Sequence, residues 1–138
     1  MNERVKNLVW IVIVIAAFSI FSVMRGGTST YLDFGDEAVT LSAPENYSYV
    51  LNYDDITGLE LVDEFDPGTM ISGGETRRYR WGTWENDVWG QYTLCSSKRI
   101  DCALIVTLTS GETLVLNYES DKTTDALLGL FTDLAESR

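Results

Sequence analysis

Histidine is absent from this chain, and proline and cysteine occur only twice each. Without histidine, the side chain that most often transfers protons near neutral pH is missing. A serine or cysteine nucleophile would have no histidine base, and two cysteines alone are too few for a zinc site. The glycine-rich phosphate-binding loops of nucleotide enzymes are also missing. The sequence therefore predicts no enzyme, no metal site and no cofactor.

Positive charge is scarce beyond the first 25 residues. From Gly26 to Arg138, seven lysines and arginines stand against 20 aspartates and glutamates, a net charge of −13. A domain this acidic is repelled by nucleic acid and by anionic lipid headgroups. We therefore expect no nucleic-acid partner and no phosphoinositide binding. The acidic clusters at 54–55 and 63–66 are more typical of solvated turns than of a catalytic carboxylate pair.

One long hydrophobic run lies at the start of the chain. Residues 8–24 read LVWIVIVIAAFSIFSVM without a charge, and Val5 extends the run. As a helix these 17 residues span about 25 Å, enough to cross a bilayer at the short end of the usual range. The sequence predicts a single transmembrane anchor over residues 1–25, with residues 5–24 in contact with the membrane. A cleaved signal peptide is the alternative, although no A-x-A pattern precedes Arg25.

The charges beside this run predict its orientation. Arg4 and Lys6 precede the apolar residues and Arg25 follows them, so the positive-inside rule places the N-terminus in the cytoplasm. Residues 26–30 (GGTST) have the composition of a flexible linker. Residues 31–138 are then an acidic extracytoplasmic domain on a single-pass membrane protein.

Short runs with strand composition follow the linker. They cover residues 38–41, 47–53, 56–62, 78–84, 88–94, 103–109 and 113–118. Asp63–Gly68 has turn composition, residues 70–75 are expected to be loop, and Ser110-Gly111 predicts a tight hairpin. Apolar residues then recur at helical spacing, which predicts a helix over residues 121–136. The expected fold class is mainly β with one C-terminal helix, an antiparallel β-sandwich or barrel of about seven strands.

The two cysteines flank the segment SSKRID. If the chain reverses at Lys98-Arg99, Cys95 and Cys102 face each other across an antiparallel hairpin and can form a disulfide. Such a bond would stabilise the fold by about 2–3 kcal/mol in the chain-entropy model, and it fits an extracytoplasmic domain. Two reduced, unrelated thiols are the alternative.

The same register predicts which side chains share a face of the sheet. One face would carry Tyr92, Leu94, Ala103, Ile105, Leu114, Leu116 and Tyr118, and the other Trp89, Leu104, Val106, Leu108 and Val115. Both faces are apolar. Such a hairpin must be covered on both sides, or it presents a patch to a partner.

Several short motifs resemble the bacterial pleckstrin-homology-like domain family over residues 31–134. They are YDDI at 53–56, Arg80-x-Gly82, Gly90-x-Tyr92-x-Leu94, ALIVT at 103–107, Gly111 with LVL at 114–116, and the closing helix. The resemblance implies a two-sheet β-sandwich of seven strands closed by a helix, in a membrane-anchored protein that acts as a scaffold or interaction module. In this family the loop that binds lipid headgroups carries basic residues. The corresponding residues 42–46 read SAPEN and have no positive charge, so the resemblance does not imply lipid binding for this chain.

The segment RRYRWGTWENDVWGQY, residues 77–92, concentrates arginine and tryptophan. Arginine beside exposed tryptophan is typical of a protein interface. The candidate partner-binding residues are therefore Arg77, Arg78, Arg80, Trp84 and Trp89. The alternative is that these arginines pair with the chain's own carboxylates and stack on Trp81 or Trp84.

Two functions from different classes stay open. The first is a membrane-anchored, non-catalytic interaction or scaffolding module that binds another, membrane, protein through an exposed Trp84 or Trp89. The alternative is an extracytoplasmic receptor for a small molecule or glycan, with a pocket lined by Trp81, Trp84 and Arg80. A flat apolar face beside an open sheet edge would favour the first function, and a concave pocket the second.

Overall fold

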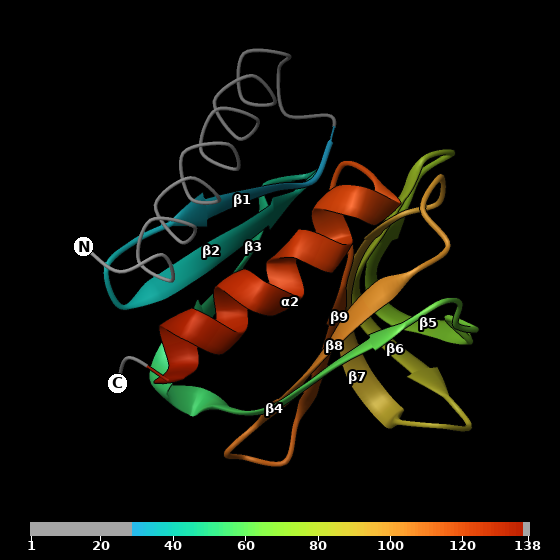
Figure 1. Cartoon of the computed structure of the whole chain (residues 1–138). Helices are drawn as coiled ribbons and strands as arrows, with labels where there is room; N and C mark the ends of the chain where they lie inside the picture. The colour runs from blue at the N-terminus through green and yellow to red at the C-terminus, as the bar shows by residue number, and fades with distance from the viewer. Residues whose placement is uncertain (1–28, 137–138) are drawn as a thin grey trace.

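The computed structural model describes residues 29–136 (Figure 1). The predicted anchor, residues 1–25, lies outside these residues, as does most of the linker. Within residues 29–136, no helix has the length and hydrophobicity needed to cross a membrane.

Nine strands, one 3₁₀ turn and one helix make up the described part of the chain. The strands are β1 (Tyr31–Phe34), β2 (Ala38–Ala43), β3 (Tyr47–Asn52), β4 (Ile56–Val62), β5 (Thr69–Glu75), β6 (Tyr79–Asn86), β7 (Gly90–Ser97), β8 (Ala103–Leu108) and β9 (Thr113–Leu116). The 3₁₀ turn η1 is Tyr53–Asp55 and the helix α2 is Asp121–Glu136. The mainly β class and the helix over residues 121–136 are confirmed. The prediction of loop over residues 70–75 is wrong, because β5 occupies it.

The strands form two sheets. One is three-stranded with the order β1-β2-β3, and the other is six-stranded with the order β4-β8-β9-β7-β6-β5. Figure 1 shows the three-stranded sheet and α2 on the same side of the six-stranded sheet. The larger sheet is mixed, because β9 pairs in parallel with β7 and antiparallel with β8.

The predicted hairpin between β7 and β8 is wrong, because β9 lies between these two strands. Asn117, which follows β9 and is 2% exposed, holds the connection from β7 to β8 in place. Its Oδ1 accepts a hydrogen bond from the Ser97 amide at 2.7 Å. Its Nδ2 donates to the carbonyls of Ile100 at 3.2 Å and Cys102 at 3.1 Å. A buried amide thus satisfies the backbone of a connection that crosses the end of β9.

The hairpin between β8 and β9 is present, but its register is shifted by one residue from the expected one. Leu108 and Glu112 pair across a three-residue turn in which Gly111 has a φ of +90°. Ile105 therefore pairs with Val115. A shift of one residue exchanges the two faces of a strand. The predicted faces are correct for Tyr92, Leu94, Ala103 and Ile105, which share the smaller core cluster, and for Leu104, Val106 and Leu108, which share the larger one. They are wrong for Trp89 and Val115, which belong with the smaller cluster, and for Leu114, Leu116 and Tyr118, which belong to the larger one.

Two apolar cores cover the two faces of the six-stranded sheet. The larger core joins it to α2 and the three-stranded sheet, and includes Leu41, Leu51, Trp81, Cys95, Leu104, Leu116, Leu127, Leu130 and Phe131. The smaller core contains Trp84, Tyr92, Leu94, Ala103, Ile105 and Val115, with Val62, Phe65 and Trp89 at its margin. The connection between β4 and β5 adjoins the smaller core, where Tyr92 Oη donates to the carbonyl of Pro67 at 2.7 Å. Both faces are thus covered.

Candidate functional site

The tryptophans of residues 77–92 contribute mainly to the cores. Trp84 is 4% exposed, and its Nε1 donates to the carbonyl of Trp81 at 3.0 Å. The expectation that Trp84 is exposed is therefore wrong. Trp89 is half-buried, with its ring centroid 5.1 Å from that of Tyr92 and 6.2 Å from that of Phe65. Neither tryptophan offers the freely exposed ring that an interface anchor needs.

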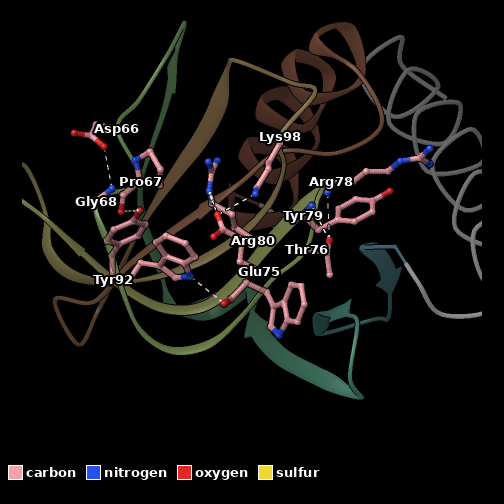
Figure 2. Close-up of polar contacts among 12 residues, drawn as sticks. Asp66, Pro67, Gly68, Glu75, Thr76, Arg78, Tyr79, Arg80, Tyr92 and Lys98 are labelled. Carbon is pink, nitrogen blue, oxygen red and sulfur yellow. Dashed lines mark hydrogen bonds and ion pairs between the residues drawn. The ribbon is translucent and has the colours of Figure 1, made fainter.

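Arg80 has its partners within the chain. Its Nε lies 3.0 Å from Glu75 Oε2, and its guanidinium lies 5.9 Å from the centroid of the Trp84 ring. Lys98 Nζ also lies 3.0 Å from Glu75 Oε2, and Figure 2 shows both cations converging on this carboxylate. The hydrogen bond from Lys98, and then that from Arg80, lowers the pKa of Glu75. For Arg80 the alternative interpretation therefore holds: it pairs with a carboxylate of its own chain, Glu75, and stacks on Trp84.

Arg77 and Arg78 form the exposed turn between β5 and β6. The Thr76 amide donates to the Tyr79 carbonyl at 2.9 Å. Thr76 Oγ1 accepts hydrogen bonds from the amides of Arg78 at 3.3 Å and Tyr79 at 3.1 Å (Figure 2). These contacts fix the turn backbone while both arginine side chains remain exposed.

A basic recess lies where this turn meets the connection between β7 and β8. It has a volume of about 380 Å³ and is lined by Arg77, Arg78, Lys98 and Arg99. The Lys98 amide donates to the carbonyl of Arg78 at 2.7 Å, which joins the two segments directly. Four of the seven basic residues beyond Gly26 thus gather at one place on an acidic domain.

Lys98 and Arg99 were absent from the candidate residues. The sequence indicated them only as the turn of a hairpin, and that hairpin does not exist. Lys98 lies beside Arg78 because β6 and β7 pair antiparallel with Tyr79 opposite Ser97, so that the next residues along are Arg78 and Lys98. The signal that could have found Lys98 is therefore the pairing of the consecutive strands β6 and β7, followed to the far end of β7.

β5 is the second feature that the candidate residues did not include. Among the strands of residues 29–136, it forms one end of the six-stranded sheet and pairs only with β6. Residues 69–73 are all exposed, with Met70 at 46% and Ile71 at 49%. The strand carries no charge before Glu75, and its register shifts between Met70 and Ser72. β5 is therefore an open, uncharged and partly apolar edge interrupted by one bulge at Ile71.

The predicted disulfide is not formed, and Cys95 and Cys102 are free thiols. Cys95 pairs with Leu116 of β9, so it does not face Cys102. Burial raises the pKa of Cys95 to about 12. Burial, and then the hydrogen bond from Cys102 Sγ to Asp121 Oδ1 at 3.2 Å, raises the pKa of Cys102 to about 11. Both thiols are therefore protonated at neutral pH.

The acidic clusters stabilise turns. Asp66 Oδ1 accepts a hydrogen bond from the Gly68 amide at 3.0 Å, and Asp55 Oδ1 lies 3.5 Å from Thr109 Oγ1. Across residues 29–136, no three acidic or sulfur side chains are grouped so as to hold a metal ion.

No protein-family model matches the sequence, and neither the curated proteins nor the solved structures contain a significant match. The features that bear on function are thus those of the chain itself. They are the open edge of β5 and the basic recess at its C-terminal end.

Proposed function

We propose that this protein is a membrane-anchored, non-catalytic module that docks another protein on the open edge of β5. The observation that carries the proposal is the exposure of residues 69–73 on an end strand of the sheet. Backbone amides and carbonyls on such an edge can pair with an added strand. Met70 and Ile71 add apolar contact beside it.

The anchor belongs to the same proposal. The hydrophobic residues 5–24, with their uncharged run at 8–24, would hold the protein in the membrane, with the N-terminus in the cytoplasm and the acidic domain outside. The first described strand begins at Tyr31, directly after the linker of residues 26–30. A linker this short would keep the domain, and with it the edge of β5, close to the membrane surface.

The likeness to pleckstrin-homology-like domains is also part of the proposal, at the level of architecture. Two sheets and a C-terminal helix support it. Nine strands, with β9 parallel to β7, depart from a plain run of seven antiparallel strands. The likeness therefore supports a role as an interaction module and implies no ligand.

The alternative is an extracytoplasmic receptor for a small molecule or glycan. The pocket that it required would be lined by Trp81, Trp84 and Arg80, but both tryptophans are buried and Arg80 is paired with Glu75. The basic recess supports a narrower version of this alternative. Four cationic side chains around about 380 Å³ would suit a small ligand with several negative charges.

Photo-crosslinking of the full chain in its native membranes tests the docking function. A photoreactive residue would replace Ile71 on β5, and the matched control would replace Val50, which is 56% exposed on β3 of the other sheet. We expect a covalent protein adduct from position 71 and none from position 50. Adducts to lipid alone, or equal adducts from both positions, would refute docking on β5.

A further inference from the structure

The hairpin of β5 and β6 carries opposite charges at its two ends. At the end where β5 begins, Thr69 pairs with Glu85, and Asp66 and Asp87 lie in the adjoining connections. All three carboxylates are exposed. At the other end, the Arg77-Arg78 turn meets Lys98 and Arg99 in the basic recess. Between the two ends, residues 69–74 of β5 carry no charge.

This polarity determines which orientation of a second hairpin would be attractive. If two such hairpins met edge to edge in parallel, like charges would face each other at both ends. If they met antiparallel about a two-fold axis near Ser72, the Arg77-Arg78 turn of each copy would lie beside the acidic end of the other. A two-fold axis makes every complementary contact twice. Opposite charges placed in this way favour one register and orientation.

We infer that the partner on the edge of β5 is a second copy of this chain, paired antiparallel through β5. The inference rests on the proposed docking function and names its partner. Gly73 and Gly74 carry no side chain, so the backbone of a second strand can approach closely there. The acidic end of one copy contacts the basic recess of the other.

The bulge at Ile71 limits how strong this pairing can be. A register shift in the middle of an edge strand interrupts the ladder and leaves short paired segments on either side. Edge-to-edge contact over one strand also buries much less area than a stable dimer interface. The dimer is therefore weak for free domains, and anchoring in one membrane raises the effective concentration that it needs.

Cysteine crosslinking of the full chain in its native membranes tests the geometry. Ser72→Cys places a thiol near the two-fold axis, and Ser110→Cys places a control thiol on the exposed turn after β8. Cys95 and Cys102 are buried, so they contribute little background. With a short bismaleimide, we expect a crosslinked dimer from Ser72→Cys and none from Ser110→Cys.

Charge reversal in the Ser72→Cys background tests the complementarity. Arg77→Glu with Arg78→Glu cancels the positive charge of the basic end, where Lys98 and Arg99 remain. Glu85→Lys with Asp87→Lys leaves Asp66 as the remaining carboxylate of the three at the other end. Each double variant alone should lose about tenfold or more in crosslinked dimer, because the attraction between the two ends is lost at both contacts of the two-fold pair. Coexpression of the two double variants should restore the dimer as a mixed pair. This restoration also shows that both variants are folded.

The combined results of the crosslinking experiments show which proposal fails: docking on β5, the second copy as the partner, or the antiparallel arrangement. If Ser72→Cys gives no dimer while the photoreactive residue at position 71 captures a different protein, the second copy is refuted and docking on β5 stands. If neither experiment gives an adduct, both are refuted. If the dimer forms but is unchanged by both double charge reversals, the antiparallel arrangement is refuted.

Discussion

Trp81 lies directly against Gly74, its register partner on the neighbouring strand. A Cβ added at Gly74 would lie 2.2 Å from Trp81 Cζ2. The indole is 2% exposed and belongs to the larger core, so it cannot move aside without disturbing other core side chains. Gly74→Ala should therefore lower the free energy of unfolding by about 1–3 kcal/mol. Urea denaturation of the full chain, followed by tryptophan fluorescence, measures this change. An unchanged midpoint would show that the ring has room to shift.

Gly129 provides the opposite case. It lies in α2, and no atom outside the helix comes within 4 Å of an added Cβ. Alanine loses less backbone freedom in a helix than glycine does, so Gly129→Ala should raise the free energy of unfolding by about 1 kcal/mol. The same urea titration measures it. A loss of stability would mean that this part of α2 has a contact that the structure does not show.

Asn117 should be among the most sensitive polar residues of the domain. Replacing it with leucine leaves the Ser97 amide and the carbonyls of Ile100 and Cys102 buried without this partner. Asn117→Leu should therefore cost about 2–3 kcal/mol. Asn52→Ala is the matched control, because Asn52 is exposed and its amide reaches Asp55 only at 3.5 Å. Equal effects of the two substitutions would contradict the role given to the Asn117 side chain.

The parts of the fold that depend on local pattern were predictable. α2 has the 3.6-residue periodicity of an amphipathic helix, and β4 and β8 have the composition and length of strands. β5 was missed because Gly73 and Gly74 have low strand propensity. It is a strand because β6 provides a partner, with Gly73 opposite Gly82 and both at positive φ.

The candidate site was predictable only in part, for a related reason. Local composition indicated the Arg77-Arg78 turn, but Lys98 is found opposite Arg78 only when the antiparallel register of β6 and β7 is known and is followed past Tyr79 and Ser97. The turn after β8 is one residue longer than the sequence predicted, and this difference changed which core each side chain of β9 enters. It moved Leu114 and Leu116 to the larger core and Val115 to the smaller one. Register and strand order depend on contacts that are distant in sequence.

Alkaline pH should destabilise the domain through its buried thiols. Burial raises the pKa of Cys95 from 9.0 to about 12 and that of Cys102 from 9.0 to about 11. Above about pH 9 the unfolded chain loses these protons while the folded chain keeps them, so the folded state binds more protons. The free energy of unfolding therefore falls as pH rises through this window and is unaffected by the thiols below it.

Cys95→Ala removes the more strongly shifted thiol and provides the comparison. Urea midpoints measured between about pH 8 and about pH 10.5 should fall for both proteins, but less steeply for Cys95→Ala. Cys95 also helps to raise the pKa of Tyr47, after burial, so the difference in slope reports Cys95 together with its effect on Tyr47. The thiol count of the denatured wild-type chain, without reductant, should be two, because both cysteines are free. Parallel slopes would show that Cys95 ionises equally in the folded and unfolded chain. A count of zero free thiols would show instead that Cys95 and Cys102 form a disulfide.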